Sequence, residues 1–167
     1  MKNTLLIAIL LLITFSNGFA QNKTKKIYFP EDNAPAMLDN AIQKAAAQKK
    51  NVLVIAGGNW CRWCLEFDRF THADSAISKY LADNYIVYHL NHSPENKNYP
   101  TLARLDYPQR FGFPVFVVLN SKGQRVHTQN SEYLEDGKGS YNKMKVLFFF
   151  ESWSPKAIDP NTYKILQ

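Results

Sequence analysis

Apolar blocks alternate along the chain with polar stretches, and their lengths suit strands and helices in turn. The segment 51–56 is an apolar run of strand length, which is typical of a central strand buried on both faces. Before it, Asp32 or Asn33 caps a predicted helix that has Pro35 in its first turn and extends to about Lys50. The residues predicted to share the apolar face of this helix are Leu38, Ile42, Ala45 and Ala46.

The alternation continues to the end of the chain. After the central strand, the apolar residues have helical spacing, which predicts a helix. A second helical segment is predicted to begin after a cap at Thr71 or Asp74. The segments 115–119 and 125–128 are joined by a tight turn at 121–124, which predicts an antiparallel hairpin. The other predicted elements are strands at 26–29 and 85–90 and helices at 101–107 and 141–153.

This order of elements predicts an α/β fold in which a central mixed β-sheet is flanked by helices on both faces. The last helix contains Phe148, Phe149 and Phe150. Three adjacent residues cannot share one helical face, so one of them is expected to be exposed. Pro155 ends this helix, and the tail to Gln167 is predicted to be irregular.

The first twenty residues have the pattern of a secretory signal peptide. Lys2 precedes an apolar run at 5–15, and the small residues before Ala20 suit a signal peptidase. The run is short for a bilayer span, which favours cleavage after Ala20 over a retained membrane anchor. The prediction is a signal peptide at 1–20 and one domain at 21–167, periplasmic or secreted, in a space where disulfides persist.

The basic charge of the chain carries no signature of a nucleic-acid ligand. The sequence has 20 basic and 14 acidic residues, a net charge of +6, which falls to +5 when Lys2 leaves with the signal peptide. Basic residues near 44–50 complement the dipole at the end of a predicted helix. Because no Arg-rich or aromatic-interleaved run accompanies the charge, we expect a solvated surface and no nucleic-acid partner.

The candidate chemistry lies in two cysteines, Cys61 and Cys64, the only ones in the sequence. The central strand and a Gly-Gly turn precede them, so Cys61 falls in the first turn of the next helix. Free backbone N–H groups and the helix dipole favour a thiolate there, and Arg62 adds a positive charge. Cys64 lies one turn further on, near enough to form a disulfide and less exposed. We therefore expect Cys61 to attack and Cys64 to resolve.

Three features carry a resemblance to a known family. They are the motif Trp60, Cys61, Arg62, Trp63 and Cys64 after an apolar strand, the step from Phe113 to Pro114 before a later strand, and the ending in a hairpin and a helix. Over residues 27–153 the chain resembles thioredoxin-fold proteins, and more narrowly the exported bacterial members with a Trp-Cys-x-x-Cys motif. The resemblance implies a thioredoxin-like fold and thiol–disulfide oxidoreductase activity.

The resemblance also implies roles for individual residues. Cys61 corresponds to the attacking cysteine, Cys64 to the resolving one, and Trp60 to a flat apolar surface beside the sulfurs. Pro114 corresponds to the family's cis-proline, which faces the disulfide and turns the backbone of Phe113 outward to pair with an extended substrate. Pro114 is preferred because it directly precedes a β-rich run. The competing candidates are Pro100 and Pro108.

The sequence departs from thioredoxin at two places. Ile55 stands where thioredoxin carries a buried acidic residue that assists the resolving cysteine. Asp68 shares a helix face with Cys64 and is a candidate substitute, although its pattern also fits a solvated carboxylate. Arg62 and Trp63 replace Gly-Pro between the cysteines. Arg62 favours a more oxidising disulfide, and Trp63 either adds apolar contact area for substrate or packs against the other tryptophan of the motif.

Other interpretations of the cysteine pair stay open. The alternative function is a non-catalytic thioredoxin-fold binding module that holds a metal ion or a peptide. A zinc site would need two more ligands, and we expect no metal because no second cysteine pair exists. A structural disulfide across so short a loop would restrict the unfolded chain only slightly. The histidines available as zinc ligands are His72, His89, His92 and His127.

We expect no cofactor beyond a redox-active disulfide between Cys61 and Cys64. The sequence has no flavin, nicotinamide or phosphate motif, because Gly57 and Gly58 lead at once into the cysteine motif rather than into a dinucleotide fingerprint. The expected partners are protein thiols and disulfides. An exported reductase would also need a membrane electron-transfer partner, which this chain does not supply.

Overall fold

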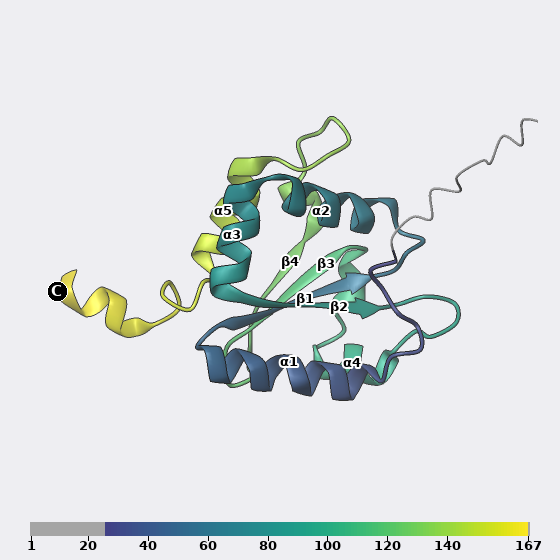
Figure 1. Cartoon of the computed structure of the whole chain (residues 1–167), viewed down its shortest axis with the longest axis horizontal. Helices are drawn as coiled ribbons and strands as arrows, with labels where there is room; N and C mark the ends of the chain where they lie inside the picture. The colour runs from purple at the N-terminus through teal and green to yellow at the C-terminus, as the bar shows by residue number, and fades with distance from the viewer. Residues whose placement is uncertain (1–25, 167) are drawn as a thin grey trace, which may run out of the picture.

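Within residues 26–166, the part of the chain that the computed structural model describes, four strands form one mixed sheet. They are β1 (Asn51–Gly57), β2 (Tyr85–Asn91), β3 (Val115–Leu119) and β4 (Arg125–Asn130). Their order in the sheet is β2-β1-β3-β4 (Figure 1). β1 pairs in parallel with β2 and antiparallel with β3, and β3 and β4 form the predicted antiparallel hairpin. The predicted signal peptide at 1–20 lies outside the described residues.

Helices cover both faces of the sheet (Figure 1). On one face lie α1 (Ala34–Gln48) and α4 (Tyr99–Arg104). On the other face lie α2 (Arg62–Ala73), α3 (Ser75–Asn84) and α5 (Lys143–Ser152). Short 3-10 helices follow at η1 (Pro108–Phe111), η2 (Ser131–Leu134) and η3 (Pro160–Leu166). The predicted α/β architecture, a mixed sheet with helices on both faces, is confirmed.

The central strand β1 separates two apolar cores. Val52, Val54 and Ala56 pack on the side of α1, whereas Leu53 and Ile55 pack with residues of α2 and α5. Every residue of β1 is buried, because strands flank it on both sides and helices cover both faces. This double burial explains why its sequence is a continuous apolar run rather than an alternating one.

Local signals fix the ends of α1. The Asn33 side chain accepts a hydrogen bond from the Ala36 N–H (3.2 Å), and a proline occupies the first turn. The helix ends where Lys49 adopts the left-handed conformation, with φ 55°. One residue of the predicted apolar face is wrong: Ala46 is exposed, and Ala41 is buried in its place. Ala41 lies four residues before Ala45 and therefore shares its face.

The predicted strand at 26–29 is not formed, and a side chain distant in sequence is the reason. The carbonyl oxygen of the Asn59 side chain accepts hydrogen bonds from the N–H groups of Ile27 (3.1 Å) and Tyr28 (3.2 Å). The amide nitrogen of Asn59 donates to the Tyr28 carbonyl (2.6 Å). Backbone groups that a strand would pair with a neighbouring strand are thus bonded to a side chain instead.

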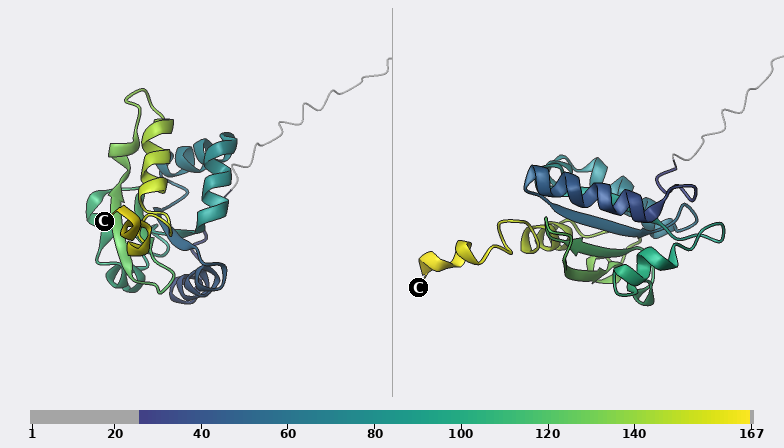
Figure 2. Two further views of the ribbon diagram at one scale, coloured as in Figure 1. Left: turned by 90° about the vertical axis from the view of Figure 1, so that its left-hand side faces the viewer. Right: turned by 90° about the horizontal axis from the view of Figure 1, so that it is seen from below.

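The elements after β2 also differ from the prediction in part. α4 begins two residues earlier than expected, and it ends at Arg104, shortly before Asp106 and Tyr107 adopt positive φ values of 59° and 54°. The tail, predicted to be irregular, contains η3, which stands apart from the layers of the fold (Figure 2). Within the described residues, no helix is both long enough and apolar enough to cross a membrane.

Aromatic packing joins α2, the sheet and α5 into one core. Phe67 of α2 is 1% exposed. Its ring centroid lies 4.4 Å from that of Phe116 in β3 and 6.4 Å from that of Phe150 in α5. As expected for three adjacent phenylalanines, one is exposed: Phe148 is 71% exposed, whereas Phe149 and Phe150 are buried.

Truncation of Phe67 should therefore be far more costly than the same truncation on the surface of α5. We expect Phe67→Ala to lower the free energy of unfolding by about 3–5 kcal/mol, because it removes buried area and leaves a cavity. The matched control Phe148→Ala should change it by no more than about 0.5 kcal/mol. Urea denaturation of the oxidised proteins measures both values, and equal losses would contradict the core position of Phe67.

Candidate redox site

The two cysteines form a disulfide at the carboxyl end of β1. Their Cα atoms lie 5.2 Å apart. Cys61 is the N-cap residue of α2, and its Sγ accepts a hydrogen bond from the Cys64 N–H (3.2 Å). Cys61 is 6% exposed and Cys64 is 1% exposed. Both cysteines are therefore buried, and the one that caps the helix is the more exposed of the two.

The position of Cys61 favours a negative charge on its sulfur. The N-terminus of a helix presents free N–H groups and the positive end of the helix dipole. Arg62, the first residue of α2, directly follows Cys61 in the sequence and is exposed to solvent. When the disulfide opens, the same Cys64 N–H that now contacts Cys61 is available to its thiolate.

Gly57 allows Cys64 to approach the end of β1. A Cβ atom at this position would lie 2.4 Å from the Cys64 Sγ and 3.0 Å from the Tyr28 hydroxyl oxygen. Neither group has room to move freely, because Tyr28 and Cys64 are both fully or almost fully buried. The glycine that precedes the motif is thus required for close contact between strand and helix.

Aromatic side chains form the rim of the site. Trp60 is 56% exposed, and its Nε1 donates a hydrogen bond to the His92 carbonyl (2.7 Å). The ring of Trp60 meets that of Phe113 edge to face, with centroids 5.7 Å apart. Phe113 stacks on the His92 ring at 4.9 Å. The sequence pointed to Trp60 and Phe113 but not to this position of His92, because the loop that carries His92 has no local pattern that relates it to the cysteines.

A shallow hollow of about 380 Å³ opens beside Trp60. Its other lining residues are His92, Ser93, Pro94 and Lys97.

The peptide bond between Phe113 and Pro114 is cis, and no other bond in the described residues is. The bonds before Pro100 and Pro108, the competing candidates, are therefore trans. Phe113 packs against the cluster of Tyr28, Cys61 and Cys64. It precedes β3 and lies outside the strand ladder.

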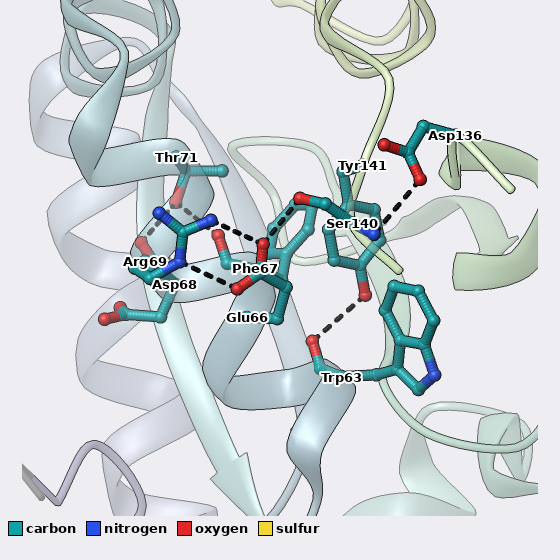
Figure 3. Close-up of polar contacts among 9 residues, drawn as sticks. All are labelled: Trp63, Glu66, Phe67, Asp68, Arg69, Thr71, Asp136, Ser140 and Tyr141. Carbon is teal, nitrogen blue, oxygen red and sulfur yellow. Dashed lines mark hydrogen bonds and ion pairs between the residues drawn. The ribbon is translucent and has the colours of Figure 1, made fainter. Parts of the chain in front are cut away.

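Trp63 packs against the cluster of Tyr28, Cys61 and Cys64 and connects α2 to the loop before α5. Its ring meets that of Tyr141 edge to face, at 5.5 Å, and its carbonyl accepts a hydrogen bond from the Tyr141 hydroxyl (3.0 Å; Figure 3). The sequence left two environments open for Trp63, contact with substrate or packing against Trp60. The ring that Trp63 meets edge to face is that of Tyr141 and not that of Trp60. Tyr141 lies 78 residues further along the chain, so no local pattern announces the contact.

A second attachment of α2 is polar (Figure 3). The Glu66 carboxylate accepts hydrogen bonds from Arg69 (2.7 Å) and from the Ser140 hydroxyl (2.5 Å). The Arg69 bond, with help from Ser140, holds the pKa of Glu66 below its usual value. Asp136 in turn accepts a hydrogen bond from the Ser140 N–H (3.1 Å). The helix that carries the cysteines is therefore tied to the 136–141 loop.

Asp68, the candidate proton acceptor, lies among histidines rather than on a fully solvated surface. Its Oδ1 lies 3.4 Å from His72 Nδ1 and 3.7 Å from His89 Nε2. Burial lowers the pKa of His89, so this ring favours its neutral form. These three residues line a cavity of about 270 Å³. Among residues 26–166, no cluster of three or more His, Cys, Asp or Glu side chains is arranged to hold a metal ion.

Comparisons with known proteins agree with this architecture. The chain is 30% identical over 73 residues to the thiol:disulfide interchange protein DsbD of Colwellia psychrerythraea, a match that covers 44% of this chain and 12% of that protein. It is 29% identical over 130 residues to DsbD of Yersinia pestis, covering 73% of this chain and 21% of the relative. The chain thus spans about a fifth or less of the length of these relatives.

A solved structure and a family model extend the comparison. The crystal structure of a disulphide isomerase from Xylella fastidiosa Temecula1 matches with a TM-score of 0.67 and 20% identity, covering 77% of this chain and 96% of that one, which shows a shared fold. The model of the Thioredoxin-like family matches residues 33–121, more than half of the sequence. With its mixed sheet, its flanking helices and its Cys61–Cys64 disulfide, the chain therefore belongs to the thioredoxin-like family.

Proposed function

We propose that this protein is a thiol–disulfide oxidoreductase that acts on protein thiols and disulfides, with Cys61 attacking and Cys64 resolving. The observation that carries the proposal is the disulfide at the N-terminus of α2, with the Cys61 sulfur capping the helix and the Cys64 sulfur buried behind it. A helix N-terminus stabilises a thiolate, and the thiolate is the nucleophile of disulfide exchange. Membership of the thioredoxin-like family and similarity to part of DsbD support the same chemistry.

In the reducing direction, the Cys61 thiolate attacks one sulfur of a substrate disulfide. A bond forms between Cys61 and that sulfur, and the other substrate sulfur leaves as a thiolate and takes a proton. The Cys64 thiolate then attacks Cys61, so that the mixed disulfide breaks and the Cys61–Cys64 disulfide forms again. The substrate leaves fully reduced, and in the oxidising direction the same steps run backwards.

The rim offers a surface suited to an extended, partly apolar segment of a protein. Trp60 is exposed next to the cysteine that would attack, and Phe113 connects it to the loop around His92. Since Phe113 lies outside the strand ladder, its backbone is a candidate partner for a substrate segment added as a strand. This arrangement favours a protein substrate over a small-molecule disulfide.

We infer the cellular setting from the N-terminal sequence. A signal peptide at 1–20 would deliver the domain to the periplasm or outside the cell, where protein disulfides form. A reductase in that space needs electrons from a membrane partner. An oxidase or isomerase would draw its disulfide from another thiol oxidant, and the reduction potential of the cysteine pair decides between these directions.

Single cysteine replacements should separate attack from resolution. We expect Cys61→Ser to abolish reduction of a protein disulfide such as insulin, because the nucleophile is lost. Cys64→Ser should instead accumulate mixed disulfides that non-reducing electrophoresis detects and dithiothreitol releases. Disulfide exchange that persists in the Cys61→Ser protein would contradict the mechanism. Retained peptide binding in a protein without exchange activity would favour the binding module instead.

The charge of Arg62 should make the disulfide more oxidising. We expect Arg62→Gln to shift the redox equilibrium toward the disulfide by about two- to fivefold, because an exposed positive charge near the helix start stabilises the Cys61 thiolate. The shift should shrink in high salt, where exposed charges are screened. Lys79→Gln, the same loss of charge on α3, is the control and should leave the equilibrium unchanged. Equal effects of the two substitutions would exclude a local role for Arg62.

A further inference from the structure

A buried hydroxyl group without a hydrogen-bond partner lies beside the inner cysteine. Tyr28 is 0% exposed, and its hydroxyl oxygen is among the few buried polar atoms of the described residues that lack a partner. The same side chain forms a small cluster with Cys61 and Cys64. Its hydroxyl oxygen lies 3.0 Å, and the Cys64 Sγ 2.4 Å, from the point where a Cβ on Gly57 would stand. The distance between the Tyr28 hydroxyl oxygen and the Cys64 Sγ is therefore no more than the sum of these two distances.

The ring of Tyr28 is held in this place from two sides. Asn59, two residues before Cys61, accepts hydrogen bonds from the N–H groups of Ile27 and Tyr28 and donates to the Tyr28 carbonyl. On the other side the ring meets that of His89 edge to face, with centroids 5.2 Å apart. The polypeptide that carries the cysteines thus also fixes the tyrosine next to them.

The chemistry of this pair differs between the two redox states. A disulfide sulfur is a poor hydrogen-bond acceptor, whereas a thiolate is a strong one. Burial, reinforced by the charge of Asp68, raises the pKa of Tyr28, so its hydroxyl keeps its proton at neutral pH and acts as a donor. The strand β1 beside Tyr28 supplies no acidic side chain. Ile55 stands where thioredoxin carries its buried acid, and it packs in the apolar core.

We propose that the Tyr28 hydroxyl donates a hydrogen bond to the Cys64 sulfur once the disulfide opens, and thereby stabilises the thiolate that resolves the mixed disulfide. The inference rests on the proposed oxidoreductase function and adds a supporting residue to that site. In the resolving step the Cys64 proton passes to solvent, the Cys64 thiolate forms a bond with Cys61, and the substrate sulfur leaves with the electron pair of the broken bond and takes up a proton. Tyr28 keeps its own proton throughout.

The first test is the redox equilibrium of Tyr28→Phe in glutathione buffers. The substitution keeps the ring and removes a hydroxyl that has no partner in the disulfide form, so the oxidised protein should unfold at the same or a higher temperature than wild type. The reduced protein should be less stable, and the equilibrium should shift toward the disulfide by about five- to tenfold. An unchanged equilibrium, or a shift toward the dithiol, would overturn the proposal.

Tyr85→Phe is the matched control. Its hydroxyl donates to the Phe150 carbonyl (2.6 Å) at the opposite end of the sheet. This variant should lose stability equally in both redox states and leave the redox equilibrium unchanged. If both variants shifted the equilibrium alike, the effect of Tyr28→Phe would be a general consequence of a lost tyrosine hydroxyl, which contradicts a specific bond to Cys64.

A second test does not depend on turnover. In the Cys61→Ser protein, ultraviolet absorbance of the thiolate follows the ionisation of Cys64. Adding Tyr28→Phe should raise the midpoint of this titration by about one pH unit, because the thiolate loses its donor. The other titratable groups that face this region, Asp68, His89 and Tyr141, are the same in both proteins. An unchanged midpoint would overturn the proposal.

The two tests also distinguish this inference from the function on which it rests. If wild-type protein did not exchange with glutathione at all, the oxidoreductase function would fail. The titration of Cys64 would still report whether Tyr28 contacts its sulfur.

Discussion

The close contact between the end of β1 and the start of α2 is the constraint on which the rest of the site depends. A Cβ on Gly57 would collide with the Cys64 sulfur, so only glycine lets the helix begin this near to the strand. Because the helix begins there, Cys61 becomes its cap and Cys64 turns inward. The same closeness brings Tyr28 against the buried sulfur, where Asn59 holds its backbone. The different exposure of the two cysteines thus depends on the glycine backbone at the end of β1.

The sequence predicted those parts of the structure that short-range patterns determine. The run at 51–56 predicted a strand buried on both faces, and the cysteine spacing predicted a disulfide at a helix start. The strand at 26–29 was wrong because its backbone groups bond to Asn59, more than thirty residues away. The environment of Trp63 likewise depends on Tyr141. Such contacts join segments that only the folded chain brings together, and no local period encodes them.

The two sides of the cysteine pair are built from different chemistry. Outward lies the exposed ring of Trp60, which meets the half-buried ring of Phe113 edge to face. Inward, hydrogen bonds from the 136–141 loop and the packing of Phe67 hold α2 in place. A reactive pair needs both properties, since the attacking sulfur must meet a partner while the resolving sulfur must stay within reach of it. The chain matches only about a fifth of the length of its DsbD relatives.

The proposed oxidoreductase function is tested most directly by the redox equilibrium of the wild-type protein across a series of glutathione buffers, scored by mass-tagging of free thiols. We expect one reversible transition in which Cys61 and Cys64 change state together. A midpoint near that of thioredoxin, about −270 mV, would indicate a reductase, and one between about −180 and −120 mV an isomerase or oxidase. Cysteines that stay unreactive in every buffer would contradict the proposed oxidoreductase function.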